Sequence, residues 1–299
     1  MYPWIDLYYF KIPSFGLMVA TAFLICHHLL KKEFKKNNLK ENIIDDIIFY
    51  AVISAILGSK IYYIIETQSY YMFYTNLQNI FIKLFSFNIP GFITELQNLG
   101  SGLVFNGGFI CALVLIAIYV YRHSLDFLFL ADIVTPYILL GHGIGRIGCL
   151  LVGDDYGIPS KLPWALSFPE GIPTTTINTF MTNFSFLNYT REELSIFLVP
   201  GQDSVITVHP TQIYEMILYF LGFILIKKFY HKLSFTKGSI FSIYLIVGGF
   251  SRFVVEFLRT NERYLFNFSS AQFISLFMVI TGLIYLSYLY KNNNSYGKN

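Results

Sequence analysis

Seven long apolar stretches follow one another along the chain. Each holds about 20 residues, the length that a helix needs to cross the ~30 Å hydrocarbon core of a bilayer. The stretches cover residues 12–30, 44–66, 101–121, 125–152, 211–230, 238–259 and 271–290. Only 13% of the residues are charged, whereas soluble domains carry about 25%. The sequence therefore predicts an all-α polytopic membrane protein with seven transmembrane helices.

The charges between the stretches predict how the chain is oriented. Lysines are concentrated after the first and fifth stretches, as at Lys31, Lys35, Lys227 and Lys232, and the alternate loops carry few. Basic loops stay on the cytoplasmic side, so we expect the N-terminus outside and the C-terminus in the cytoplasm. Residues 67–100 would then be an outer surface arm and residues 153–210 a small periplasmic cap. Residues 1–299 form one membrane domain in this interpretation.

Polar side chains interrupt four of the stretches at a similar depth. Counting 1.5 Å per residue from the outer end of each predicted helix places Asn106, Arg146, Glu215 and Arg252 roughly 6–10 Å below the outer surface. An arginine inside a span costs roughly 2.5–3.5 kcal/mol on insertion scales, so such a residue is a functional candidate by default. We expect these four groups to face one water-accessible cavity.

The stretch 238–259 carries two further charges beyond Arg252. Arg252, Glu256 and Arg259 are spaced so that they share one helix face. Guanidinium groups match phosphate oxygens in pairs, so the cavity suits a phospholipid headgroup. Simpler alternatives stay open: Arg146 could join helices by pairing with a carboxylate, Arg259 could reach the interface, and His209 could cap a helix.

Several other classes of function are disfavoured. Cys26, Cys111 and Cys149 are odd in number and lie far apart, which argues against a disulfide framework and a metal site. The pattern G-x-G-x-x-G from Gly143 to Gly148 lies inside a span, where glycines permit close helix packing rather than nucleotide binding. The basic residues are divided among short loops, so we expect no nucleic-acid partner. No cofactor is expected either.

Five motifs carry a resemblance to a known family. They are IPSFGL at residues 12–17, FNGG at 105–108, GRIGCLLVGDDYG at 145–157, HPTQIYE at 209–215 and RFVVEFLR at 252–259. Together they resemble the bacterial prolipoprotein diacylglyceryl transferases. The resemblance implies a multi-pass protein of the bacterial cytoplasmic (inner) membrane, with its active site facing the outer leaflet. It also implies transfer of the diacylglyceryl group of phosphatidylglycerol to the lipobox cysteine thiol of a prolipoprotein signal peptide.

The resemblance assigns roles to residues of this chain. The catalytic candidates are Arg146, Arg252, His209, Glu215 and Asn106. The phospholipid headgroup is expected to be bound by Arg146, Arg252, Arg259, Glu256, Gly157 and Asp154.

The chain also departs from the family's pattern. Asn106 replaces a histidine, Phe15 a tyrosine, Cys149 and Val152 two asparagines, and Asp154 a glutamate. Two alternatives therefore stay open: a diverged member that binds phospholipid but uses another acceptor, and an outward-facing anion transporter or receptor. The second is disfavoured because the sequence shows no internal repeat.

Overall fold

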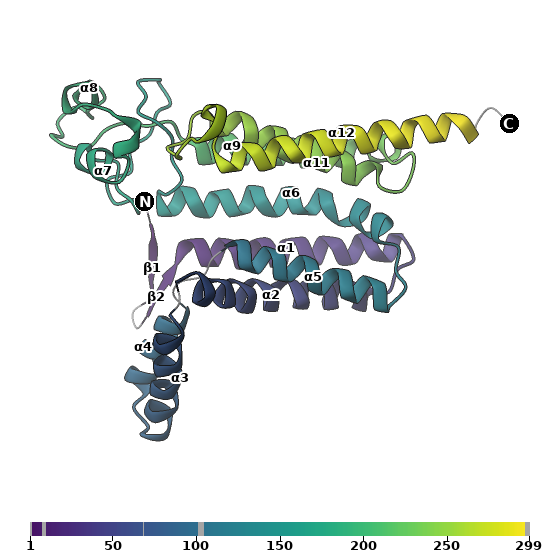
Figure 1. Ribbon diagram of the computed structural model, residues 1–299, viewed down its shortest axis with the longest axis horizontal. Coiled ribbons are helices and arrows are strands. Elements are labelled where there is room, and N and C mark those ends of the chain that lie inside the picture. Colours follow the sequence, from purple (N-terminus) through teal and green to yellow (C-terminus); the bar gives the residue numbers. More distant parts are fainter. Residues whose placement is uncertain (1, 8–9, 68, 101–104, 297–299) are drawn as a thin grey trace. The chain divides into compact units, whose positions relative to one another are not determined.

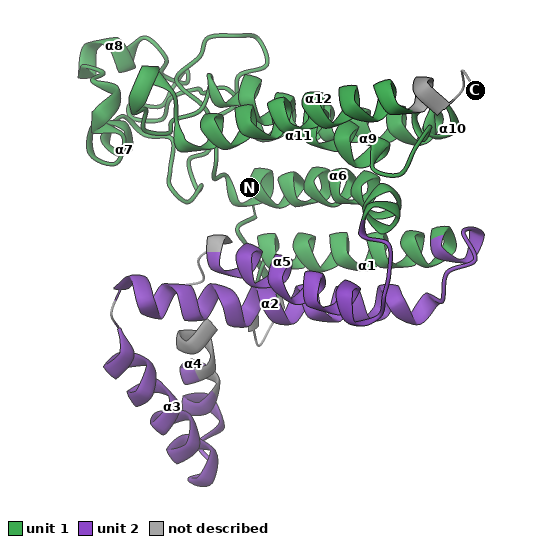
Figure 2. Ribbon diagram, turned by 45° about the vertical axis from the view of Figure 1, so that its right-hand side comes forward, with its two compact units in different colours: residues 1–33, 128–299 green, residues 34–127 purple. Residues whose placement is uncertain are grey.

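The computed structural model describes residues 2–7, 10–67, 69–100 and 105–296. Of residues 7, 10, 93, 96–100, 105–106 and 293–296 only the backbone is described. The chain divides into two compact units (Figure 2). Unit 1 comprises residues 1–33 and 128–299, and unit 2 comprises residues 34–127.

Seven helices coincide with the predicted apolar stretches (Figure 1). They are α1 (Ser14–Lys36), α2 (Glu41–Thr67), α5 (Phe105–Arg122), α6 (Phe127–Val152), α9 (Thr211–Lys228), α11 (Ser239–Glu256) and α12 (Ser270–Tyr296). Five of them, α1, α2, α6, α11 and α12, are long and apolar enough to cross a membrane. The chain is therefore a multi-pass helical membrane protein. The described apolar part of α5 is shorter, and α9 carries Glu215 with two lysines, so spans for these two stay a prediction.

The packing of unit 1 explains where α11 begins. Gly238 precedes the helix with φ of 90°, a conformation that favours glycine. The buried carboxylate of Asp132 on α6 accepts hydrogen bonds from the backbone N–H groups of Gly238 (2.7 Å) and Phe241 (2.8 Å). These bonds satisfy donors that a helix N-terminus leaves unpaired. Asp132 thereby fixes the start of the helix that carries Arg252. A short helix, α10 (Tyr230–Leu233), precedes this turn.

A short hairpin precedes α1 and was not part of the all-α prediction. Strand β1 (Trp4–Leu7) pairs antiparallel with β2 (Phe10–Pro13). The N–H of Tyr2 donates to the Leu151 carbonyl (3.1 Å), which ties the N-terminus to the end of α6. A Cβ on Gly148 of α6 would lie 3.1 Å from Phe15 Cδ2. The start of α1 thus packs directly against the glycine-rich end of α6.

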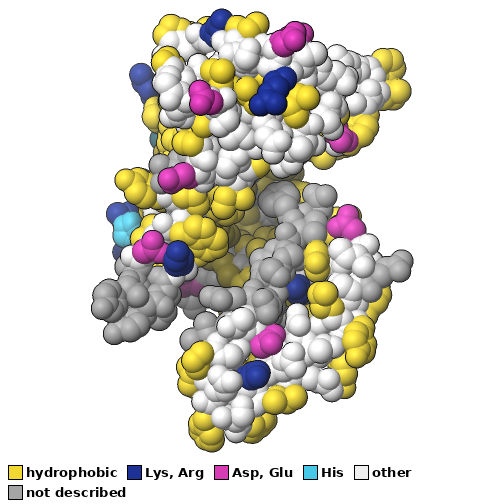
Figure 3. Space-filling view, turned by 90° about the vertical axis from the view of Figure 1, so that its left-hand side faces the viewer, with side chains coloured by type: hydrophobic (Ala, Val, Ile, Leu, Met, Phe, Trp, Pro, Cys, Tyr) yellow, Lys and Arg dark blue, Asp and Glu magenta, His cyan; other side chains and the backbone are white. Residues whose placement is uncertain are grey.

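Residues 153–210, the segment predicted as a periplasmic cap, contain a small core of their own, and we call this segment the cap. The cap contains α7 (Ile177–Thr182), a 3-10 turn (η1, Ser185–Leu187) and α8 (Arg191–Ser195), and the rest is turns and isolated bridges. Tyr156 stacks on Phe168 with ring centroids 5.7 Å apart, and Leu194 and Ile206 are fully buried beside them. On the face shown in Figure 3, acidic and basic side chains of the described residues are interspersed.

Unit 2 contains a close helix pair and an exposed arm. Gly58 of α2 faces Gly107 of α5 so closely that a Cβ on Gly58 would lie 2.6 Å from the Gly107 carbonyl oxygen. Tyr119 donates to Asp46 (2.7 Å) nearer the other end of this pair. The glycines next to Asn106 therefore serve helix packing. The arm consists of α3 (Tyr70–Phe85) and α4 (Ile89–Gly100), and α3 has no buried residue.

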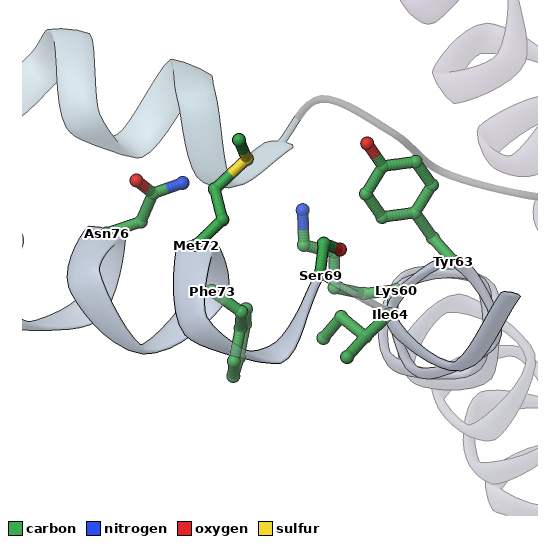
Figure 4. A pocket seen from close by; sticks show the side chains of 7 residues that line it. All are labelled: Lys60, Tyr63, Ile64, Ser69, Met72, Phe73 and Asn76. Carbon is green, nitrogen blue, oxygen red and sulfur yellow. The ribbon is translucent and has the colours of Figure 1, made fainter. Parts of the chain in front are cut away.

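A cavity of about 310 Å³ lies between α2 and α3 (Figure 4). Lys60, Tyr63, Ser69 and Asn76 supply its polar lining. Lys60 Nζ lies 5.2 Å from the centre of the Tyr63 ring, an ordinary cation–π arrangement.

A final short 3-10 turn in unit 1 (η2, Leu265–Asn267) connects α11 to α12. It follows the segment that carries Arg259 and Asn261. The two helices then pack closely, because a Cβ on Gly249 would lie 2.8 Å from the Ser275 carbonyl oxygen.

Candidate active site

The predicted charged residues of unit 1 come together at one end of its helices. Arg146 lies near the end of α6, and Glu215 lies near the start of α9. Arg252 and Glu256 lie in the last turns of α11, and Arg259 follows directly. Three separate segments of the chain thus deliver charge to a single place.

Together with Asp155, these side chains form a closed ring of alternating charge, which we call the charge ring. Its members are, in order, Arg146, Glu215, Arg252, Glu256, Arg259 and Asp155. Each neighbouring pair is an ion pair, and the last member closes the ring onto the first.

Glu215 is the hub of one half of this ring. Its Oε2 pairs with Arg146 Nε, and its Oε1 lies 2.5 Å from Arg252 Nη1. The same Oε1 lies 3.8 Å from Arg259 Nη1. One carboxylate therefore contacts all three arginines, which holds guanidinium groups from α6 and α11 side by side.

Glu256 and Asp155 complete the other half. Glu256 Oε2 lies 3.1 Å from Arg252 Nη2 and 3.6 Å from Arg259 Nε. Asp155 Oδ2 accepts a hydrogen bond from Arg146 Nη1 (2.6 Å), and its Oδ1 pairs with Arg259 Nη2. Asp155 was not predicted as a site residue, yet it bridges two of the predicted arginines.

Burial strengthens the interactions among these charges. The side chains of Glu215 and Glu256 are 0% exposed, that of Arg259 is 4% exposed, and that of Asp155 is 41% exposed. Charges that are removed from water interact far more strongly than charges on the surface. Neighbouring residues support the buried acids, since Glu256 Oε1 accepts hydrogen bonds from Asn261 Nδ2 and Ser269 Oγ, both at 2.7 Å.

Backbone contacts fix the segment that carries Asp155. Thr211 Oγ1 donates to the Asp155 carbonyl (2.6 Å), and Gln212 Nε2 donates to the Asp154 carbonyl. Gly157 donates its N–H to the His209 carbonyl (2.9 Å) and forms a bridge with Arg259. The end of α6, the start of α9 and the end of α11 are therefore tied together by hydrogen bonds to the main chain of residues 154–157.

Gly157 is required for this arrangement. A Cβ at this position would overlap the Leu258 carbonyl oxygen and would lie 2.8 Å from Thr211 Cγ2. The structure thus places the predicted Gly157 beside the site, where it permits close approach of three backbones.

The pKa values of the two adjacent aspartates are shifted in opposite directions. Burial alone would raise the pKa of Asp155, but the Arg259 and Arg146 guanidinium groups overcome it and lower the pKa to about 2. For Asp154, burial and then the charge of Asp155 raise the pKa to about 6. Asp155 is therefore the ionised partner of the arginines, and Asp154 stands beside the ring. The predicted headgroup role of Asp154 has no ion pair to an arginine among the described contacts.

His209 lies near this site but forms no ion pair with the ring among the residues that the structure describes. Its Nδ1 lies 3.3 Å from the hydroxyl of Tyr214, which in turn accepts a hydrogen bond from Trp164 Nε1 (2.8 Å). Partial burial lowers the pKa of His209. A neutral imidazole is therefore favoured near neutral pH.

Asn106 is the one predicted catalytic residue that belongs to unit 2. It is the second residue of α5, and its side chain lies outside the described residues. Its catalytic role stays a prediction.

Cys149 takes the place of a family asparagine directly at the ring. Its Sγ accepts from Arg146 Nη1 at 3.4 Å and lies 4.0 Å from Asp155 Oδ2. Cys149, Asp154 and Asp155 are close enough for a shared metal ion. However, Asp155 is already paired with two guanidinium groups, whose positive charge opposes a cation at this point.

Comparison with known proteins shows the family of this chain. The family model for prolipoprotein diacylglyceryl transferases matches residues 4–288. The chain belongs to this family. A phosphatidylglycerol–prolipoprotein diacylglyceryl transferase of Clostridium tetani is 33% identical over 280 residues, which cover 93% of each chain. Proteins of the same name from Finegoldia magna (30% identity, 90% of this chain and 88% of the relative) and Prochlorococcus marinus (32%, 96% and 93%) are also similar.

Membership in the prolipoprotein diacylglyceryl transferase family makes the chain a transferase. The match includes every member of the charge ring, since residues 146–259 lie inside it. The resemblance inferred from the five motifs is thereby confirmed.

Proposed function

We propose that this chain transfers the diacylglyceryl group of phosphatidylglycerol to the lipobox cysteine of a prolipoprotein, in the bacterial cytoplasmic membrane. The observation that carries the proposal is the charge ring, in which Arg146 of α6, Arg252 of α11 and the following Arg259 share one buried carboxylate. A phosphodiester needs such paired donors, because each guanidinium fork matches two phosphate oxygens. The names of the relatives supply both substrates.

The reaction gives the ring residues their roles. The thiol loses its proton to the solvent, and its sulfur bonds to the glycerol carbon of the diacylglyceryl group. The bond from this carbon to the phosphate oxygen breaks, and glycerol phosphate leaves with the electron pair. Arg146 and Arg252 stabilise the charge on the departing phosphate, and Arg259 binds the headgroup. Glu215 and Glu256 hold the arginines in position.

The proposed topology follows the loop charges. Seven spans with the N-terminus outside would put the charge ring and the cap (residues 153–210) on the periplasmic side. The arm, α3 and α4, would then lie on the periplasmic surface of the cytoplasmic membrane, where its exposed apolar side chains meet lipid. The active site would open to the outer leaflet, which also holds the phosphatidylglycerol to be consumed.

A reconstituted transfer assay tests the proposal. Purified protein in nanodiscs that contain labelled phosphatidylglycerol is incubated with a lipobox peptide, and the label on the peptide is measured. We expect transfer to the cysteine peptide and none to a matched peptide with serine at that position. Lipid binding without transfer to the cysteine would contradict the proposal.

One observation favours the second candidate, a member that binds phospholipid but uses another acceptor. Asn106 stands where the family has a histidine, and an amide cannot accept a thiol proton at neutral pH. The variant Asn106→His tests whether the missing histidine limits the thiol step. A strong gain of transfer would favour an enzyme whose thiol step is impaired, whereas an unchanged rate in an active protein would show that this step does not need a histidine.

A further inference from the structure

Asp155 occupies the place in the charge ring that an anionic ligand would take. Its two carboxylate oxygens are divided between two guanidinium groups, with Oδ1 on Arg259 and Oδ2 on Arg146. A phosphodiester likewise presents two unesterified oxygens on one central atom. The side chain of Asp155 therefore holds both arginines at a spacing that a phosphate can bridge.

The charge balance of the ring limits what can enter it. Three guanidinium groups face three carboxylates, so the ring is neutral as it stands. A phosphodiester would add one negative charge to a site whose acids are mostly buried. An unpaired charge in such surroundings has a large unfavourable free energy. Entry of the lipid phosphate therefore requires one carboxylate to leave.

Among the three acids, Asp155 leaves most easily. Glu215 and Glu256 are 0% exposed, and Glu256 is also held by Asn261 and Ser269. Asp155 is 41% exposed, and its carboxylate is bound by the arginines alone among the residues that the structure describes, apart from the distant thiol of Cys149.

The surroundings of Asp155 permit its side chain to turn away while the main chain stays fixed. Its carbonyl is held by Thr211, so the backbone is anchored. A cavity of about 170 Å³ adjoins the side chain and is lined by Thr260 and Asn261, among others. Because Asp155 itself lines this cavity, its carboxylate has room to turn without a shift of the main chain.

We propose that Asp155 is an internal substitute for the lipid phosphate, which exchanges with a singly charged phosphodiester and thereby determines headgroup specificity. This inference rests on the proposed function. One carboxylate leaves as one phosphodiester enters, so the ring stays neutral. A phosphomonoester carries about −1.5 to −2 charges at pH 7, so it would leave the ring negative and bind less well.

The same exchange assists product release. The leaving glycerol phosphate is a phosphomonoester, so it is more strongly charged than the lipid from which it came. The return of Asp155 to Arg146 and Arg259 then displaces a product that the ring does not neutralise. The substrate binds and the product departs because the two differ in charge.

The test compares binding of two lipids by the unmodified protein and by Asp155→Asn. Dissociation constants are measured in detergent for phosphatidylglycerol, a phosphodiester, and phosphatidic acid, a phosphomonoester, with free glycerol phosphate as competitor. We expect the unmodified protein to prefer phosphatidylglycerol. Asp155→Asn should bind both lipids about tenfold or more tightly, since one like charge has been removed. It should gain most for phosphatidic acid and glycerol phosphate.

Controls separate this role from a structural one. Asp203→Asn removes one exposed carboxylate elsewhere in the cap and should change neither constant. Asp155→Glu keeps the charge and should keep the preference for phosphatidylglycerol. Equal or weaker lipid binding by a folded Asp155→Asn would overturn the inference. So would an unmodified protein that prefers phosphatidic acid, a result that needs no variant to fold.

The outcome is separable from that of the proposed function. If the unmodified protein transfers the diacylglyceryl group but Asp155→Asn shows no change in lipid preference, only the exchange fails. If the lipids exchange as described but no transfer to the lipobox peptide occurs, the proposed reaction fails instead.

Discussion

Arg146 and Glu215 form an ion pair between α6 and α9 in which the carboxylate is completely buried. The two residues lie far apart in sequence, and each also contacts a further member of the charge ring. The pair therefore joins helix packing to the geometry of the site. A change to either residue should affect both stability and activity.

Replacement of Glu215 by glutamine should be strongly destabilising. The change leaves three arginines without their shared counter-charge, and loss of one partner from a buried pair costs about 3–5 kcal/mol. Thermal unfolding in detergent measures the effect, and transfer activity should fall with it. Glu192→Gln, an exposed acid of α8, is the matched control. An unfolding temperature like that of the control would contradict the ring as a stabilising element.

The variant Arg146→Lys should retain the fold and lose most activity. Arg146 uses Nε for Glu215 and Nη1 for Asp155, and a single ammonium group cannot reproduce this fork. We expect the rate of transfer to fall roughly 100-fold, the effect of removing one stabilising donor from a transition state. Arg191→Lys, on the cap surface, should behave like the unmodified protein. A fully active Arg146→Lys would remove Arg146 from the mechanism.

Two glycines of one motif should respond differently to alanine. A Cβ on Gly157 would overlap the Leu258 carbonyl oxygen, whereas a Cβ on Gly145 would meet nothing within 4 Å. Gly157→Ala should therefore lower both the unfolding temperature and the transfer rate, because Arg259 pairs with this backbone. Gly145→Ala should leave both nearly unchanged. Equal tolerance at the two positions would show that the three backbones do not meet as described.

Asp154 should make stability depend on pH. Its pKa is raised to about 6 from an ordinary value near 3.8, so the folded protein binds this proton more tightly than the unfolded chain. The resulting stabilisation is complete below about pH 4 and is lost as the pH rises through about 6, a change of about 1–3 kcal/mol. In Asp154→Asn, the unfolding temperature should change less with pH between pH 4 and 7 than it does in the unmodified protein. If this variant kept the full pH dependence, another group would have to be responsible.

The sequence predicted much of this site because charge inside an apolar stretch is rare. Arg146, Glu215 and Arg252 stand out in their helices without any alignment, and a count of residues along each helix already placed them at one depth. Arg259 and Glu256 followed from helical spacing on the same face. These predictions depend only on local periodicity, which the helix geometry fixes.

The features that were not predicted involve partners from distant segments. Asp132 is an ordinary acid near the start of α6 in sequence, but it caps α11. Apolar and polar residues do not alternate regularly enough in residues 4–13 to predict the two strands of the hairpin.

By itself, the sequence determined a multi-pass helical protein with charged residues inside several of its apolar segments, because apolar length and charge within it are properties of single segments. Only the tertiary structure decided that Asp155, rather than Asp154, bridges Arg146 and Arg259. The two aspartates are neighbours outside any helix, so no periodicity distinguishes them. Side-chain hydrogen bonds from Thr211 and Gln212 of α9 to the carbonyls of the two aspartates set which one faces the arginines, and those bonds exist only after the helices have packed.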